Sequence, residues 1–190
     1  MRILLCVVAA FPFMLSAQSA GTCATPFAPS GAISGELTMT LRTGNTLITG
    51  TDAPALRITC EVADQRRAGD IKISFAANHL TIRGGPDNEV SFRVEVPRTL
   101  NLRIRCSAGN LTIAKISGDK DVALNAGNMT IEVGNPASYR SVDVSVLAGN
   151  INAAAYATAH DGLFRSFQHQ NAGGKYRLHA SVLAGNLTLK

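Results

Sequence analysis

The triplet Ala-Gly-Asn recurs along the second half of this chain, each time followed by an apolar residue. Full copies span 108–110, 126–128, 148–150 and 184–186, and Thr43-Gly44-Asn45 and Ala68-Gly69-Asp70 look like degenerate copies. Glycine adopts positive φ without steric cost and asparagine tolerates unusual backbone geometry, so each triplet predicts a sharp reversal between strands. The residues expected at these structural turns are Gly109, Asn110, Gly127, Asn128, Gly149, Asn150, Gly185 and Asn186.

The spacing of the glycines is regular. Gly109, Gly118 and Gly127 are nine residues apart (118 − 109 and 127 − 118), so a strand with its turn takes nine residues and a pair takes eighteen. Gly149 and Gly185 are separated by 185 − 149 = 36, twice that pair.

Between the triplets, apolar and polar residues alternate with period two from Gly35 onward, which is typical of strands with one buried face. The sequence therefore predicts an all-β fold. The nine-residue spacing favours a β-solenoid-like stack of short strands, in which equivalent asparagines form an amide ladder. Because Gly-Asn also suits two-residue hairpins, an antiparallel β-meander or sandwich is the alternative.

The first twenty residues read as a secretory signal peptide. Arg2 precedes an apolar run over 3–15, and small residues follow, which suits cleavage after Ser19 or Ala20. An uncleaved anchor is the other interpretation, and no second membrane segment follows. We therefore expect a signal peptide at 1–20, a linker at 21–34, one repetitive β domain at 35–190, and a location in the periplasm or at the outer surface.

Three cysteines remain after the predicted cleavage. An exported protein meets an oxidising compartment, where a disulfide is stable. Cys60 and Cys106 end the similar segments LRITC and LRIRC, which suggests a bond between them, with Cys23–Cys60 as the competing pair.

Composition argues against a nucleic-acid partner. Without Arg2, 17 basic residues face 13 acidic ones, and the basic residues are scattered. Aromatic residues make up 5% of the chain, with no Trp, whereas nucleic-acid binders concentrate basic charge and stacking aromatics. The partners expected are an envelope protein or glycan; the oligomeric state stays open, and open solenoid ends allow end-to-end association.

No motif for catalysis, metal binding or cofactor binding is visible, so we expect no catalytic residues, no metal and no cofactor. Asp119 and Asp121 flank a Gly turn, where Asp is common, and no Gly-x-Ser-x-Gly elbow is present. The Asn-x-Thr triplets at 110, 128 and 186 are explained by turn chemistry rather than glycosylation. A hidden site would lie in 156–176, where the repeat is interrupted. There Phe164, Arg165 and Phe167 either form a contact patch or, as we favour for the phenylalanines, plug the core end.

The stretch VSFRVEVPRTLNLRIRCSAGNLTIAKISGDKDVALNAGNMTIEV resembles the bacterial putative-adhesin domain of unknown function, and GLFRSFQHQNAGGKYRLHASVLAGNLTLK resembles the C-terminal closure of such domains. The resemblance covers residues 35–190. It implies a β-solenoid-like fold in exported or envelope proteins and carries no catalytic residues.

The leading functional hypothesis is a non-enzymatic exported structural or adhesive module of the bacterial cell envelope. The alternatives are a carbohydrate-active enzyme with a site near 156–176 and a periplasmic accessory protein in envelope-stress signalling.

Overall fold

The computed structural model describes residues 18–86 and 89–190. Most of the predicted signal peptide lies outside these residues. The described chain is all-β, with three short 3₁₀ turns. The strands are β1 (Ser19–Thr22), β2 (Glu36–Leu41), β3 (Asn45–Thr51), β4 (Arg57–Val62), β5 (Lys72–Ala76), β6 (His79–Arg83), β7 (Val90–Pro97), β8 (Asn101–Ala114), β9 (Lys120–Ile131), β10 (Tyr139–Ala153), β11 (Thr158–Gln170) and β12 (Tyr176–Leu189).

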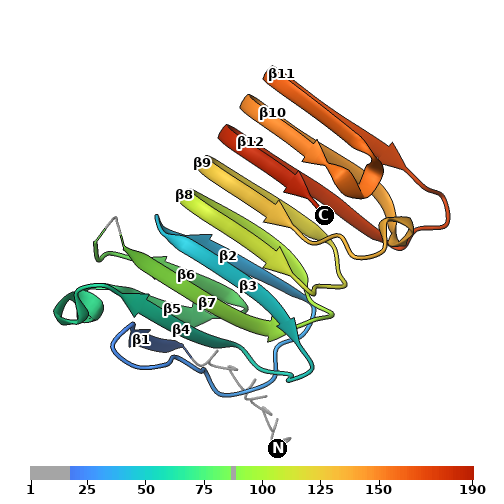
Figure 1. Ribbon diagram of the computed structural model, residues 1–190. Coiled ribbons are helices and arrows are strands. Elements are labelled where there is room, and N and C mark those ends of the chain that lie inside the picture. Colours follow the sequence, from blue (N-terminus) through green and yellow to red (C-terminus); the bar gives the residue numbers. More distant parts are fainter. Residues whose placement is uncertain (1–17, 87–88) are drawn as a thin grey trace, which may run out of the picture.

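The twelve strands form one mixed sheet, and they follow one another side by side along a single direction (Figure 1). We refer to this row of strands as the stack. Its middle is parallel, in the order β2-β8-β9-β12-β10. Both ends are antiparallel: β11 pairs with β10 at one end, and the pairs β1–β5, β5–β6 and β4–β7 lie at the other. The sheet is therefore a mixed one, not a regular solenoid throughout.

The Ala-Gly-Asn copies lie inside long strands and do not separate one strand from the next. β8 shows this directly, because its first part pairs with β2 and its second part with β3, two strands joined by a short corner at 42–44. Gly109 has a φ of 108° at the equivalent point. The alternation of buried and exposed residues shifts by one position at this bend. Cys106 and Leu111 are five positions apart, which would put them on opposite sides of a regular strand, yet both are buried. Each copy is thus a bend that keeps one side of the strand on the core.

Backbone pairing continues through the bends. Gly109 lies opposite Gly127, Gly127 opposite Gly185, and Ala148 beside Gly149 lies opposite Ala184. A Cβ on Gly127 would lie 2.0 Å from the carbonyl oxygen of Gly109, so the close stacking of the corners requires glycine. The degenerate copy at 43–45 joins this stack, since Gly44 N–H donates to Ala108 O. The copy at 68–70 does not, because it ends the 3₁₀ turn η1 (Gln65–Asp70).

The asparagines form an amide ladder on the outer side of the bends. Asn110 Nδ2 donates to Asn45 Oδ1 at 2.9 Å, Asn128 to Asn110 at 3.0 Å, and Asn186 to Asn128 at 2.8 Å.

The order of strands departs from the order of the sequence near the C-terminus. The step from β8 to β9 is the predicted eighteen residues, because Gly109 faces Gly127. β12, red in Figure 1, is then inserted between β9 and β10. The copies at 149 and 185 therefore lie on adjacent strands, although 36 residues, twice the eighteen-residue spacing, separate them in the sequence.

The core is one cluster of apolar side chains from the inward sides of the strands. One charged group is buried within it: Lys120, 2% exposed, donates from Nζ to Ile116 O, Gly118 O and Tyr139 OH. Burial lowers the pKa of Lys120 to about 8 and raises that of Tyr139 well above its ordinary value. These three acceptors use all three protons of the ammonium group, so the buried charge is fully hydrogen-bonded.

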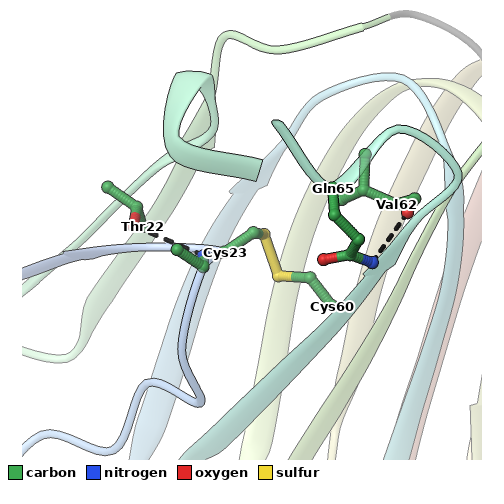
Figure 2. Close-up of a disulfide and its surroundings, with 6 residues drawn as sticks. Thr22, Cys23, Cys60, Val62 and Gln65 are labelled. Atoms are coloured by element: carbon green, nitrogen blue, oxygen red, sulfur yellow. Dashed lines mark hydrogen bonds between the residues drawn. A yellow bond between two sulfur atoms is a disulfide. The ribbon is translucent and has the colours of Figure 1, made fainter. Parts of the chain in front are cut away.

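The N-terminal end of the stack is fastened by a disulfide. Cys60 is bonded to Cys23, so the suggested bond to Cys106 is wrong (Figure 2). Cys106 lies on β8, away from β4, and stays a buried free thiol whose Sγ donates to the carbonyl oxygens of Arg42 and Ala108. Burial raises its pKa to about 11.

The segment 21–34, predicted to be a linker, packs against this end. Phe27 and Ile33 are buried, and Phe27 exchanges two backbone hydrogen bonds with Ile58 of β4. Together with the disulfide, this contact covers the core at the N-terminal end.

Candidate contact surface

The other end of the stack, at β11, is built differently; we call it the C-terminal end, although the last residue of the chain follows β12. β11 pairs with β10 along its length, from Ser141 opposite Gln170 to Ala153 opposite Thr158, and has no other partner strand. It follows the same bend, with Gly162 opposite Gly149 and a φ of 111°. Its second backbone edge is therefore open.

Both sides of β11 face solvent over most of its length. Arg165 and His160 lie opposite the buried Val146 and Ile151, so they point to the core side of the sheet. No further strand of the described chain lies beyond β11 to cover them, and both are exposed. Leu163 shares their side and is 63% exposed.

The outer side carries a row of large apolar side chains. Phe164 is 78% exposed and lies beside Leu147 of β10, which is 40% exposed; Leu183 of β12 follows at 53%. Phe164 also has a φ of 53°, a left-handed conformation that costs a non-glycine residue energy. Among the described residues, these three and Leu163 are the exposed large hydrophobic side chains.

A shallow depression of about 470 Å³ accompanies this apolar row. The next outward row along the strands consists of small side chains that form its floor: Ser166, Ser145, Ser181 and Ala123, on four neighbouring strands. Small residues beside large ones leave room for a ligand group over the floor. The surface is therefore a step, apolar on one side and hydroxyl-bearing on the other.

Charged side chains lie beyond the serine row. Asp121 accepts hydrogen bonds from Arg105 and lies near Arg103, and these arginines hold the pKa of its carboxyl below the ordinary value. His179 Nδ1 lies 3.7 Å from Asp143 Oδ2 on the adjacent strand. Asp119 is bound by the Arg177 guanidinium at 3.1 Å. Asp119 and Asp121 are thus each ion-paired with an arginine.

The predicted contact patch divides into two parts. Phe164 is exposed, whereas Phe167 is partly buried, with its ring centroid 5.3 Å from that of Tyr156. Tyr156 also stacks on His169 at 4.9 Å, so these rings form the plug at the core end. The Arg165 side chain folds back over the bend, and its Nη2 would lie 2.9 Å from a Cβ on Gly162.

The interrupted stretch 156–176 is thus mainly an edge strand. His160 and His169 lie on different sides of its bend. In the described part of the chain, no three His, Cys, Asp or Glu side chains converge as metal ligands. Over the same residues, no helix is long and apolar enough to cross a membrane.

Leu147, Leu183 and Leu163 were not predicted as surface residues. A signal was present for two of them, because the identical hexapeptide SVLAGN at 145–150 and 181–186 puts a leucine at an outward position of each strand. Alternation predicts this outward side, but only the insertion of β12 beside β10 brings the leucines together.

Comparison with known proteins supports the fold. No protein-family profile matches the chain, and no curated protein matches it. Among solved structures, a putative cell adhesion protein from Clostridium sporogenes is similar over 93% of this chain and 99% of its own, at a TM-score of 0.53 and 11% identity. A putative adhesin from Bacteroides fragilis aligns over 94% of this chain and 99% of its own, at 0.31 and 7%. The first likeness shows a shared fold.

Proposed function

We propose that this protein is a non-enzymatic, exported adhesive or structural module of the bacterial cell envelope, and that its C-terminal end makes the contact. The observation that carries the proposal is the outward row of Phe164, Leu147 and Leu183 on three adjacent strands, with Phe164 in a strained backbone conformation. Apolar groups gathered on a surface favour binding, because contact removes them from water.

Three further features support this proposal. The Cys23–Cys60 disulfide suits an oxidising compartment outside the cytoplasm. The similar structure from Clostridium sporogenes carries the name of a putative cell adhesion protein. The parallel strands β2, β8, β9, β12 and β10 lie side by side, an arrangement that offers an extended outer face to a partner.

The chemistry of the candidate contact surface suggests the class of partner. Apolar side chains lie on one side of the depression and serine hydroxyl groups on the other, which suits an envelope glycan or protein that presents both apolar and polar groups. Most carbohydrate-active enzymes use a pair of carboxylates, whereas Asp119, Asp121 and Asp143 beyond the serine row are paired with arginines or a histidine.

Binding of the purified protein to envelope preparations tests the proposal. We expect Phe164→Ser and Leu183→Ser each to weaken retention by roughly tenfold, the equivalent of about 1.4 kcal/mol. Leu47→Ser, at an outward position of β3 far from this end, is the matched control and should leave retention unchanged. Equal retention of all variants would contradict the proposal. Recovery of one soluble signalling protein, without binding to the envelope polymers, would favour the accessory role in envelope stress.

A further inference from the structure

We infer that the outer side of β3, β7 and β4 carries a binding site for a free α-amino acid, which is held as a zwitterion between Glu61 and Arg93. The site goes beyond the proposed function, because it lies on strands that the candidate contact surface does not use. Either proposal can therefore be correct without the other.

An open cavity of about 300 Å³ lies over these strands. Strand pairing places its side chains in rows across the sheet. One row consists of Glu61 on β4, Ser91 on β7 and Asn45 on β3, and the next row along the strands has Arg93 beside Leu47. Neighbouring strands lie about 4.8 Å apart, so the short side chain of Ser91 leaves a notch between the longer ones on either side.

Glu61 and Arg93 carry opposite charges in the same cavity, but they are not paired with each other. Their positions are diagonal, since Glu61 lies opposite Ser91 and Arg93 follows two residues further along β7. Among the described residues, neither charged side chain takes part in an ion pair or a hydrogen bond. The cavity therefore offers one free carboxylate and one free guanidinium on two sides of the notch.

The asparagine ladder ends in this cavity and adds a hydrogen-bond donor. Along the ladder each side-chain nitrogen donates to the next asparagine, and Asn45 Oδ1 accepts the last of these bonds, from Asn110. The next residue in the row is Ser91, and Asn45 Nδ2 has no acceptor within the described chain. A carboxylate placed over Ser91 thus lies between two groups of donors, the Asn45 amide and the Arg93 guanidinium.

An α-amino acid matches these groups. Its ammonium donates to Glu61 and its carboxylate accepts from Arg93 and Asn45, so each free charge of the cavity gains a partner of opposite sign. The notch over Ser91 leaves room for the α-carbon. The side chain of the ligand then lies over the half-buried Leu47, which favours an apolar amino acid such as leucine. A sugar, or a residue inside a peptide, lacks both charges and leaves the carboxylate and the guanidinium unpaired.

Titration of the purified protein with free leucine, followed by NMR shifts of backbone amides, tests the inference. We expect saturable shifts around residues 45, 61, 91 and 93, with a Kd of about 1 mM because the cavity is open to solvent. N-acetyl-leucine lacks the ammonium charge and leucinamide lacks the carboxylate, so each should bind at least roughly tenfold more weakly.

Substitutions assign the charges to their residues. Glu61→Gln and Arg93→Gln should each weaken the binding of leucine by roughly tenfold. Arg57→Gln and Glu95→Gln are the matched controls and should leave the Kd unchanged. These two residues lie opposite each other on the same two strands, one row beyond Arg93 and outside the cavity.

No shift at leucine concentrations up to about 10 mM would overturn the inference, and so would equal binding of leucine and its two blocked forms. Equal binding of glucose would show that the cavity recognises hydroxyl groups and not a zwitterion. These comparisons use the unmodified protein, so they are independent of how the variants fold. Envelope retention is measured without added amino acid and should be unchanged in Glu61→Gln, so the failure of one proposal is distinguishable from the failure of the other.

Discussion

At the scale of single residues, the corner glycines fix how closely the strands stack. The would-be Cβ positions of Gly109, Gly127, Gly149 and Gly185 each lie 1.7–2.1 Å from the carbonyl oxygen of the glycine in the next strand. All four also have φ between 108° and 139°. Steric overlap and backbone strain therefore act together at the same positions.

We predict that Gly127→Ala destabilises the protein by roughly 3–5 kcal/mol, because overpacking and a strained φ add at one site. Gly69→Ala is the matched control: nothing lies within 4 Å of its Cβ position and its φ is ordinary. Its free energy of unfolding in urea should stay within about 0.5 kcal/mol of the parent value. Equal effects of the two substitutions would contradict the stacking of the corners.

Lys120 gives the protein a pH dependence at alkaline pH. Its pKa is about 8 when folded, below its ordinary value of 10.5, so between these values the unfolded chain binds a proton that the folded chain lacks. Lys120 should therefore add about 2–3 kcal/mol to the free energy of unfolding between pH 8 and pH 10. The buried Cys106 thiol, whose pKa is raised from 9.0 to about 11, offsets part of this gain above pH 9. Above pH 10 the gain is opposed, because Tyr139 ionises in the unfolded chain but resists ionisation when folded.

Urea unfolding between pH 7 and pH 10 measures this effect. Lys120→Met should remove the rise, while Lys72→Met, at an exposed position on β5, should keep it. A rise that survives Lys120→Met would assign the pH dependence to another group.

At the scale of elements, period-two alternation predicted the strands, and the Ala-Gly-Asn copies predicted the asparagine ladder found at Asn110, Asn128 and Asn186. The copies were expected as turns between strands, however, and the structure shows them as bends within strands. These features depend on neighbours in sequence or on one repeated contact. The mistaken disulfide shows the limit of such reasoning. Cys60 and Cys106 end similar segments, but β4 and β8 are not adjacent, and local similarity contains no information on adjacency.

The insertion of β12 between β9 and β10 was beyond sequence reasoning for a related reason. β10 and β12 share the hexapeptide SVLAGN, so either strand presents the same groups to β9. The choice between them depends on the whole connection through β11. The row of exposed apolar side chains could not be predicted from the sequence for the same reason, because Leu147 and Leu183 become neighbours only when β12 lies beside β10.

Paired cysteines test the strand order. Thr130 lies opposite Thr188, and Thr188 opposite Asn152, so Thr130→Cys with Thr188→Cys joins adjacent strands. Residues on adjacent strands are about 4.8 Å apart, within disulfide reach, while the next strand is about twice as far. We expect rapid bond formation in the Thr130/Thr188 pair and little in Thr130→Cys with Asn152→Cys. The reverse result would show that β10, not β12, pairs with β9.

At the scale of the whole molecule, the two ends of the stack have different roles in this account. A disulfide and a packed segment cover one end, and the other presents an open strand edge beside exposed apolar groups. The rings of Tyr156 and Phe167 cover the core at the β11 end, but Leu163 and Phe164 beside them stay exposed, and exposed apolar surface costs free energy in water. This asymmetry is the reason for proposing that contact is made at the β11 end.

Hydrogen-exchange footprinting of the protein on envelope preparations tests this assignment most directly. We predict added protection in β10, β11 and β12, centred on residues 147, 164 and 183, with no change in β1, β4 or the segment 21–34. Protection centred on the N-terminal end, or spread evenly along the stack, would contradict it.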